Sequence, residues 1–345
     1  MITTGRLDNR DKTEYKTAQY IADKPDYIKD YYRRGLLMSG GSHTTHYVYI
    51  CMACRYIAYL QGKGIDVSTT ENFDYRNTSD YLASVSMGDD GARRSNSYFN
   101  TTWSSLNRFF KFLIADGQMT VNPLDRIGRA KGKDHPNRIV LDSKEIKTTF
   151  HRIKEEQEYK SGKYWWMPYR DEAIIMILLQ TGIRATALTE INMDNVVVNY
   201  DSEGNPVGAT INIIDKEETE FRRYISSDAV KSILVWERVR KHLLEEIGWG
   251  EVDALFLGAN LDRMSLRGVE RVVEKYTPEV NGHKVTPHKF RATYGTTLYK
   301  GTHDIHYVQK QMGHASPETT QIYIVDTGED ERKATDIMER LMKGE

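Results

Sequence analysis

The sequence has no apolar run long enough to span a membrane and no signal peptide at its start. We therefore expect a cytoplasmic protein. The chain also lacks an excess of charge of either sign, because 48 lysines and arginines are balanced by 49 aspartates and glutamates. This balance neither favours nor excludes a nucleic-acid ligand, and a DNA-binding protein of this composition must concentrate its cations locally.

Cysteine is scarce, since Cys51 and Cys54 are the only two in the sequence. They form a Cys-x-x-Cys pair preceded by His43 and His46, a set that suggests a zinc-binding module. The surrounding residues are typical of one continuous helix, along which the outer ligands would lie ~16 Å apart. One metal ion cannot be reached by all four side chains from a single helix. We therefore predict a packed helix face with buried cysteines, and no metal site.

Apolar periodicity and turn residues divide the chain into four parts. These are a flexible N-terminal arm (1–20), a helical domain (21–121), a basic linker (122–138) and a second domain (139–345). The helical domain is expected to hold helices at residues 26–38, 43–61, 74–86 and 94–116. The second domain is expected to combine helices with three strands, at residues 196–200, 209–214 and 221–225. The predicted fold class is therefore mainly α with a small antiparallel sheet, an α+β arrangement.

The stretch from residue 286 to 324 carries the clearest chemistry. Thr286 followed by Pro287 predicts a helix start, with a side-chain cap and a proline at the first helical position. His288 and Arg291 then lie on one face near the positive end of that helix, where a phosphate is favoured. This face is therefore a candidate phosphate clamp.

The rest of this stretch adds a candidate nucleophile. Gly301 is expected to interrupt the helix, residues 303–312 to form a second short helix, and Gly313 to end it. His314 follows directly, and Tyr323 lies nine residues further on. If the helices pack together, this histidine and tyrosine lie close to the clamp.

These residues resemble the tyrosine recombinases, also called phage integrases. The family pattern is Thr-Gly-Leu/Ile-Arg, then His-x-x-Arg, then Leu/Met-Gly-His, then a tyrosine about nine residues later. The matching residues here are Thr181-Gly182-Ile183-Arg184, His288, Arg291, Met312-Gly313-His314 and Tyr323. Four elements in the family's order make the resemblance specific, whereas each alone would be weak.

The resemblance implies a reaction on double-stranded DNA that needs no cofactor. Tyr323 would attack a phosphorus, forming a 3′-phosphotyrosyl link and releasing a 5′-hydroxyl, and a partner strand's 5′-hydroxyl would later reverse the step. Arg184 and Arg291 would bind the non-bridging oxygens, and His314 would add a donor. His288 would assist proton transfer from the tyrosine.

The resemblance also implies a catalytic lysine on the hairpin between the last two strands. Lys216 lies in that turn and so inherits the role of general acid, with Arg222 and Arg223 as nearby alternatives. One position departs from the family pattern: Ala187 stands where an acidic residue usually follows the first arginine. Because Glu190 lies about one helical turn further on, we expect the group that orients Arg184 to come from elsewhere.

By the same resemblance, the helical domain would be a core-binding domain that grips DNA. Its candidate phosphate contacts are Arg93, Arg94, Arg108 and Lys111. The linker holds five cations and one acid between residues 126 and 138, and looks flexible. Its candidate contacts are Arg126, Arg129, Lys131, Lys133 and Arg138.

The expected function is site-specific recombination that integrates, excises or transposes a mobile element at the nucleoid. In this family the C-terminal segment docks on a neighbouring protomer to link a tetramer, and here that segment is the amphipathic helix expected at residues 329–342. Alternatives are a non-catalytic DNA-binding regulator and a DNA-relaxing enzyme of the type IB topoisomerase class. The complete set of site residues argues against the regulator.

Overall fold

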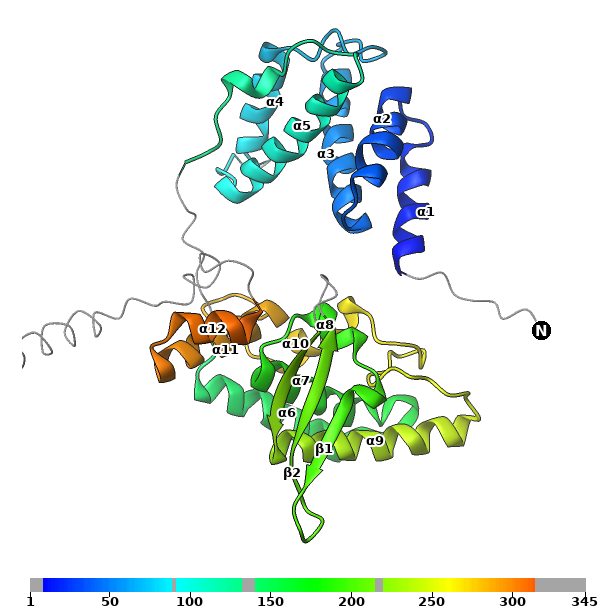
Figure 1. Ribbon diagram of the computed structural model, residues 1–345, viewed down its shortest axis with the longest axis vertical. Coiled ribbons are helices and arrows are strands. Elements are labelled where there is room, and N and C mark those ends of the chain that lie inside the picture. The colour runs from blue at the N-terminus through cyan, green and yellow to red at the C-terminus, as the bar shows by residue number, and fades with distance from the viewer. Residues whose placement is uncertain (1–8, 89–90, 132–139, 215–219, 314–345) are drawn as a thin grey trace, which may run out of the picture. The chain divides into compact units, whose positions relative to one another are not determined.

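The computed structural model describes residues 9–88, 91–131, 140–214 and 220–313, and divides into two compact units, Met1–Pro136 and Asn137–Glu345 (Figure 1). Its described residues are mostly helical, with one three-stranded antiparallel sheet in the second unit. The predicted fold class is confirmed.

The regular elements of the first unit, in its described residues, are all helices. It contains α1 (Asn9–Ile21), α2 (Asp26–Asp30), a π-helical segment (Tyr31–Leu36), a 3-10 turn (Leu37–Ser39), α3 (His43–Gly62), α4 (Tyr75–Ser86) and α5 (Asn96–Ala115). Side chains of Ser42, Asp74 and Ser95 cap α3, α4 and α5, because their oxygens satisfy N–H groups that have no partner within the helix. The four predicted helices are confirmed, the first in an irregular form.

An apolar stripe on α5 builds the core of this unit. Leu106, Phe110 and Leu113 are fully buried, spaced so that they share one face of the helix. The Phe110 ring meets the ring of Tyr56 from α3 edge-on, with 5.7 Å between centroids, a favoured aromatic geometry.

The prediction of a flexible arm is wrong for residues 9–20, which belong to α1. This helix packs against α3, and Thr17 and Ile21 are 1% and 4% exposed. The Thr17 hydroxyl donates to the carbonyl of Thr13 at 2.7 Å, so a polar residue is buried at little cost. A helix with so few apolar residues shows no periodicity in the sequence, which is why the pattern missed it. Residues 1–8 lie outside the described residues.

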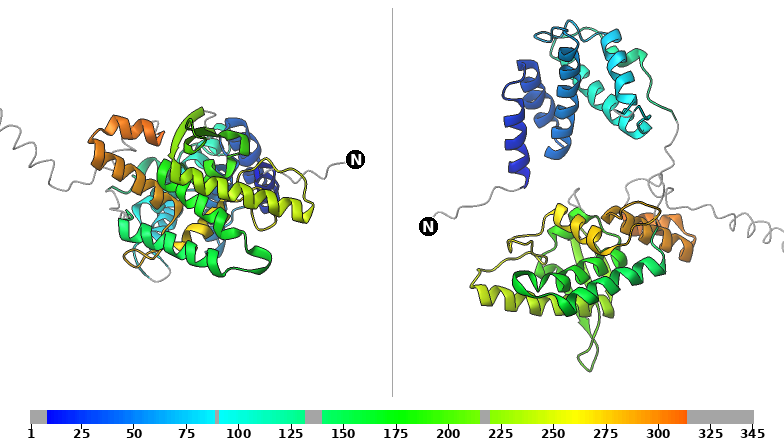
Figure 2. Two further views of the ribbon diagram at one scale, coloured as in Figure 1. Left: turned by 90° about the horizontal axis from the view of Figure 1, so that it is seen from below. Right: turned by 180° about the vertical axis from the view of Figure 1, so that it is seen from behind.

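The second unit arranges its helices around the sheet. Its elements are α6 (Ser143–Tyr159), α7 (Met167–Thr181), α8 (Ala185–Glu190), β1 (Val196–Tyr200), β2 (Pro206–Ile214), β3 (Glu220–Ser226), α9 (Ser227–Ile247), α10 (Leu266–Tyr276), α11 (Pro287–Thr302) and α12 (Ile305–Met312). The strand order is β1-β2-β3. On β2, Ala209, Ile211 and Ile213 are buried, and α9 crosses this strand (Figure 2). The three predicted strands are confirmed.

The ends of α11 and α12 differ from the sequence prediction in two details. The helix α11 passes through Gly301 and ends at Thr302, and its C-cap residue His303 takes up the left-handed conformation at φ 51°. The side chain of Thr286 makes no capping hydrogen bond, although Pro287 is the first helical residue as predicted. Asp304 instead caps α12, and Gly313 ends that helix at φ 60°, as expected for a glycine C-cap.

Candidate functional site

The loop that leads to Arg184 is shaped by Gly182. The buried helix α7 ends at this glycine, whose φ of 58° is left-handed. A Cβ atom placed there would lie 2.3 Å from Cδ1 of Tyr294 on α11, so only glycine allows the two segments to approach this closely. The loop then turns into α8, where Arg184 is the N-cap residue and is half-buried.

Arg291 joins this loop to two further elements. Its side chain is 6% exposed and extends from α11. One terminal nitrogen, Nη1, donates to the carbonyl of Gly182 at 2.8 Å, and Nη2 donates to the carbonyl of Met312. A single guanidinium therefore ties the segment before Arg184 to the C-terminal end of α12, since its planar fork can serve two acceptors at once.

His288 lies one helical turn before Arg291 on α11. The residue as a whole is exposed, yet partial desolvation and then the charges of Arg291, Lys289 and Arg184 lower the pKa of His288 below its usual 6.5. Each effect disfavours the imidazolium. A neutral imidazole near two arginines is able to accept a proton at neutral pH.

The structure thus brings together Arg184, His288 and Arg291, three of the predicted catalytic residues, from segments more than 100 residues apart. Lys216, His314 and Tyr323 lie outside the described residues. Ala187, the position that departs from the family pattern, is 5% exposed and packs in the apolar core. Glu190 is exposed at the end of α8.

Arg223, named with Arg222 as an alternative to Lys216, is a buried residue of β3. It is 8% exposed, with its guanidinium 4.4 Å from the centroid of the Phe221 ring. Its Nη2 donates to the carbonyl of Gln311 on α12. The alternation of β3 could have revealed this, because Phe221, Arg223 and Ile225 point to the same side. Arg222, by contrast, is exposed.

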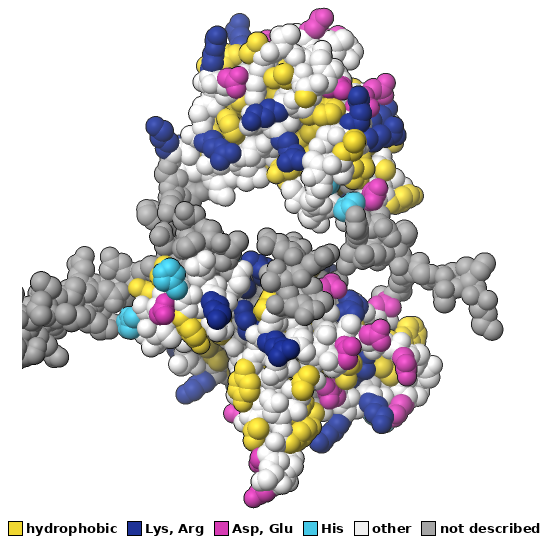
Figure 3. Space-filling model, viewed as in Figure 1, with side chains coloured by type: hydrophobic (Ala, Val, Ile, Leu, Met, Phe, Trp, Pro, Cys, Tyr) yellow, Lys and Arg dark blue, Asp and Glu magenta, His cyan; other side chains and the backbone are white. Residues whose placement is uncertain are grey.

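In the first unit, basic side chains are scattered over the surface among apolar ones (Figure 3). Of the candidate DNA contacts, Arg94 is half-buried, and the exposed ones are Arg93, Arg108, Lys111, Arg126, Arg129 and Lys131. Arg108 lies 5.6 Å from the Tyr49 ring, and its Nη2 donates to the Ser39 hydroxyl. Lys133 and Arg138 lie outside the described residues.

The first part of the basic linker is not a free tether. Trp103 of α5 donates to the carbonyl of Ile127 at 2.7 Å, and Asn100 exchanges two hydrogen bonds with the backbone of Ala130. Arg129 lies 4.9 Å from the Trp103 ring, within range of a cation–π contact. The prediction of a flexible linker is therefore wrong for the described residues up to 131, which are held along α5.

The Cys-x-x-Cys pair lies on α3, one helix from His43 to Gly62 as predicted. Cys51 is half-buried, and burial raises the pKa of the Cys54 thiol to about 12, which makes that thiol unreactive. In the part of the chain that the structure describes, no three histidine, cysteine or acidic side chains are grouped to hold a metal ion. No helix among those residues is long and apolar enough to cross a membrane.

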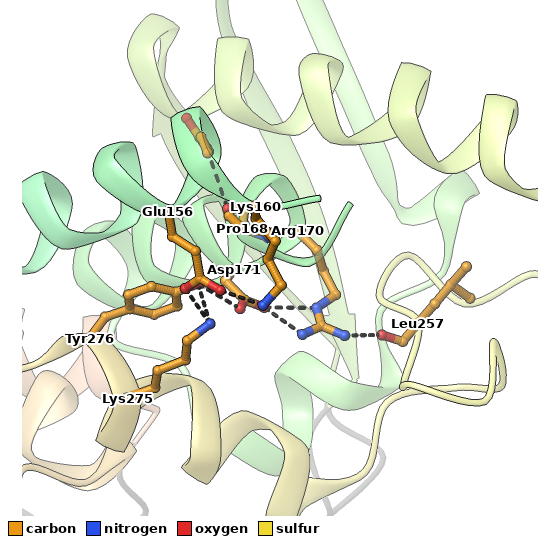
Figure 4. A network of polar contacts seen from close by, with 9 residues as sticks. Glu156, Lys160, Pro168, Arg170, Asp171, Leu257, Lys275 and Tyr276 are labelled. Carbon is orange, nitrogen blue, oxygen red and sulfur yellow. Dashed lines mark hydrogen bonds and ion pairs between the residues drawn. The ribbon is translucent and has the colours of Figure 1, made fainter. Parts of the chain in front are cut away.

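A polar network ties together α6, α7 and α10 (Figure 4). Tyr276 donates to Glu156 and Asp171, at 2.7 and 3.2 Å. Burial alone would raise the pKa of Glu156, but hydrogen bonds from Lys160, Lys275 and Tyr276 lower it to about 2. Arg170 binds Asp171 through two nitrogens at 2.8 and 2.6 Å. The network fixes α7, the helix that leads into the loop before Arg184.

Comparison with known proteins places these observations in a family. The model of the phage integrase family matches residues 140–329, more than half of the chain. Tyrosine recombinase XerC of Pelobacter propionicus is 26% identical over 271 residues, which cover 78% of this chain and 80% of that protein.

Two solved structures are similar in fold. The XerH site-specific recombinase bound to palindromic difH substrate, in a post-cleavage complex, has a TM-score of 0.63 at 18% identity, over 86% of this chain and 81% of that one. A lambda integrase tetramer bound to a Holliday junction has a TM-score of 0.56 at 18% identity, over 93% of this chain and 88% of that one.

Proposed function

This chain belongs to the phage integrase family of tyrosine recombinases, which cleave and rejoin DNA, and we propose that it recombines double-stranded DNA at specific sites through a covalent tyrosine intermediate. One observation carries the proposal: Arg291 binds both the loop before Arg184 and the C-terminal end of α12. It gathers the segments that bear Arg184 and Arg291 around His288, whose pKa is lowered by desolvation and then by these charges. A phosphodiester is the ligand that such a set suits.

In the proposed reaction, Tyr323 attacks the phosphorus and displaces the 5′-oxygen. Arg184 and Arg291 bind the non-bridging oxygens and stabilise the charge that develops on them. His288 takes the phenolic proton, which its lowered pKa allows at neutral pH. Lys216 protonates the departing 5′-oxygen, and His314 adds a donor to the phosphate.

The helical first unit is proposed to grip the same DNA. Its exposed cations offer sequence-independent contacts to phosphates, and the linker residues held along α5 add Arg126, Arg129 and Lys131 to this surface. The remaining candidates, Arg93, Arg94, Arg108, Lys111, Lys133 and Arg138, complete the proposed set.

The biological role that we propose is integration, excision or transposition of a mobile element, in the cytoplasm at the nucleoid. Four protomers would act on two DNA sites, joined through residues 329–342. The tetrameric form of the similar lambda integrase structure supports such an assembly.

Trapping of the covalent adduct tests the proposed reaction. The protein is incubated with nicked DNA from the ends of the element that encodes it, so that the 5′-hydroxyl fragment diffuses away and religation is blocked. We expect an adduct on a denaturing gel that disappears in Tyr323→Phe and persists in Tyr307→Phe, which changes an exposed tyrosine of α12. Retained DNA binding with no adduct on any candidate end would instead favour a DNA-binding regulator.

A further inference from the structure

Two buried arginines meet the C-terminal end of α12 from different elements. Arg291 of α11 donates to the carbonyl of Met312, and Arg223 of β3 donates to the carbonyl of Gln311. The last carbonyls of a helix have no partner within it and carry partial negative charge. The guanidinium groups supply both the donors and the positive charge that this end requires.

The position of Arg223 in the sheet explains how it reaches α12. It pairs with Ile211 of β2 and lies on the side of the sheet that holds the buried residues Ile213 and Ile225. Its Nη1 donates to the carbonyl of Arg222 at 2.9 Å, while its Nε is buried without a hydrogen-bond partner. Burial accordingly lowers the pKa of Arg223.

Such burial is costly for the fold. Among the described residues no carboxylate pairs with Arg223, and an unpaired buried cation is expensive. An apolar side chain between Ile211 and Phe221 would fill the same place without this desolvation cost. An apolar side chain could not donate to the carbonyl of Gln311. This hydrogen bond joins the strand after the Lys216 hairpin to the helix before His314.

On the basis of the proposed function, we propose that Arg223 is a positioning residue for DNA cleavage. Together with Arg291, it fixes the position of the C-terminal end of α12. The segment that bears His314 and Tyr323 follows directly from that end in the chain. It acts through the backbone of Gln311 rather than by touching the DNA. Arg223 therefore affects the rate of the covalent step and not the affinity for DNA.

The test compares Arg223→Met with Arg240→Met in the full-length protein. Arg240 is a matched control, because it is also 8% exposed, also has a buried Nε without a partner, and also donates to backbone carbonyls, those of Val252 and Ala254. Both variants therefore lose a similar contact, but only Arg223 lies beside α12. Adduct formation is measured in a single turnover with saturating nicked DNA, and DNA affinity is measured separately.

We expect Arg223→Met to slow adduct formation roughly 10- to 100-fold, the usual consequence of misplacing a reacting group. Arg240→Met should keep the rate within about twofold, and both variants should keep the unchanged protein's DNA affinity. Arg223→Lys should recover part of the rate, because an ammonium can still donate to one carbonyl. Equal slowing in the Arg223→Met and Arg240→Met variants, or a loss confined to DNA affinity, would overturn the positioning role.

A substrate with sulfur in place of the 5′-bridging oxygen separates positioning from acid catalysis. A thiolate leaves without a proton, so this DNA should restore the rate of a variant that lacks the general acid. With the same DNA, adduct formation by Arg223→Met should stay slow. Full restoration of its rate would contradict the proposal. An unchanged protein that forms no adduct would refute the proposed function itself, whereas a normal rate in Arg223→Met would refute only the role of Arg223.

Discussion

Replacement of Gly182 by alanine should destabilise the protein through two separable effects. The first is the left-handed backbone, which costs an L-residue about 1–2 kcal/mol, less about 0.4–1 kcal/mol gained because alanine restricts the unfolded chain. The second is the clash of the new Cβ with Tyr294, at 2.3 Å from Cδ1. Overpacking of this kind costs about 1–3 kcal/mol. The expected total is about 3 kcal/mol in the free energy of unfolding.

Gly248 provides the matched control. It ends α9 in the same left-handed conformation, at φ 66°, but a Cβ there would meet nothing within 4 Å. Gly248→Ala should therefore cost about 1 kcal/mol, the backbone effect alone. Urea denaturation of both variants at neutral pH measures the difference, provided that the m-values agree.

A double mutant tests the assigned cause. In a Tyr294→Ala background, the ring atoms at 2.3 and 2.7 Å are gone and only the Cβ at 3.0 Å remains, so Gly182→Ala should cost little more than Gly248→Ala. Because the Gly182 carbonyl also accepts from Arg291, adduct formation should slow as well in the single variant. Equal losses of stability for Gly182→Ala and Gly248→Ala would refute the argument that Tyr294 makes this glycine necessary.

The remaining predictions concern pH. Because the pKa of Glu156 is lowered from 4.5 to about 2, its ionised form stabilises the fold above pH 4.5, by about 1–2 kcal/mol after allowance for solvent screening of a partly exposed group. This stability is lost as the pH falls toward 2. The destabilisation in Glu156→Gln should therefore shrink over that range in denaturation series, while Glu245→Gln at an exposed site has little effect at any pH. A pH-independent gap would contradict this assignment. The Lys289 charge helps to lower the pKa of His288, so in Lys289→Gln the cleavage rate should begin to fall at a higher pH on acidification. Lys300→Gln, at the exposed far end of α11, should leave that profile in place, and an unmoved profile in Lys289→Gln would exclude the proposed influence.

Local patterns predicted most of the elements because they depend on neighbours in the chain. The stripe on α5, the proline that begins α11 and the glycine that ends α12 each have a physical effect within one or two helical turns. Such signals also identified the segments that carry Arg184, His288 and Arg291. These signals did not predict the helix α1, because its few buried residues, among them Thr17, form no apolar period.

The sequence by itself determined which residue types are available for phosphate chemistry and in which order they follow. Only the tertiary structure decided what their side chains contact: Arg291 binds a carbonyl 109 positions away, and Arg223 one 88 positions away. The same applies to the linker residues that α5 holds. These outcomes could not be read from spacing, because a guanidinium is buried or exposed according to the elements packed against it, and those elements lie far away in the chain.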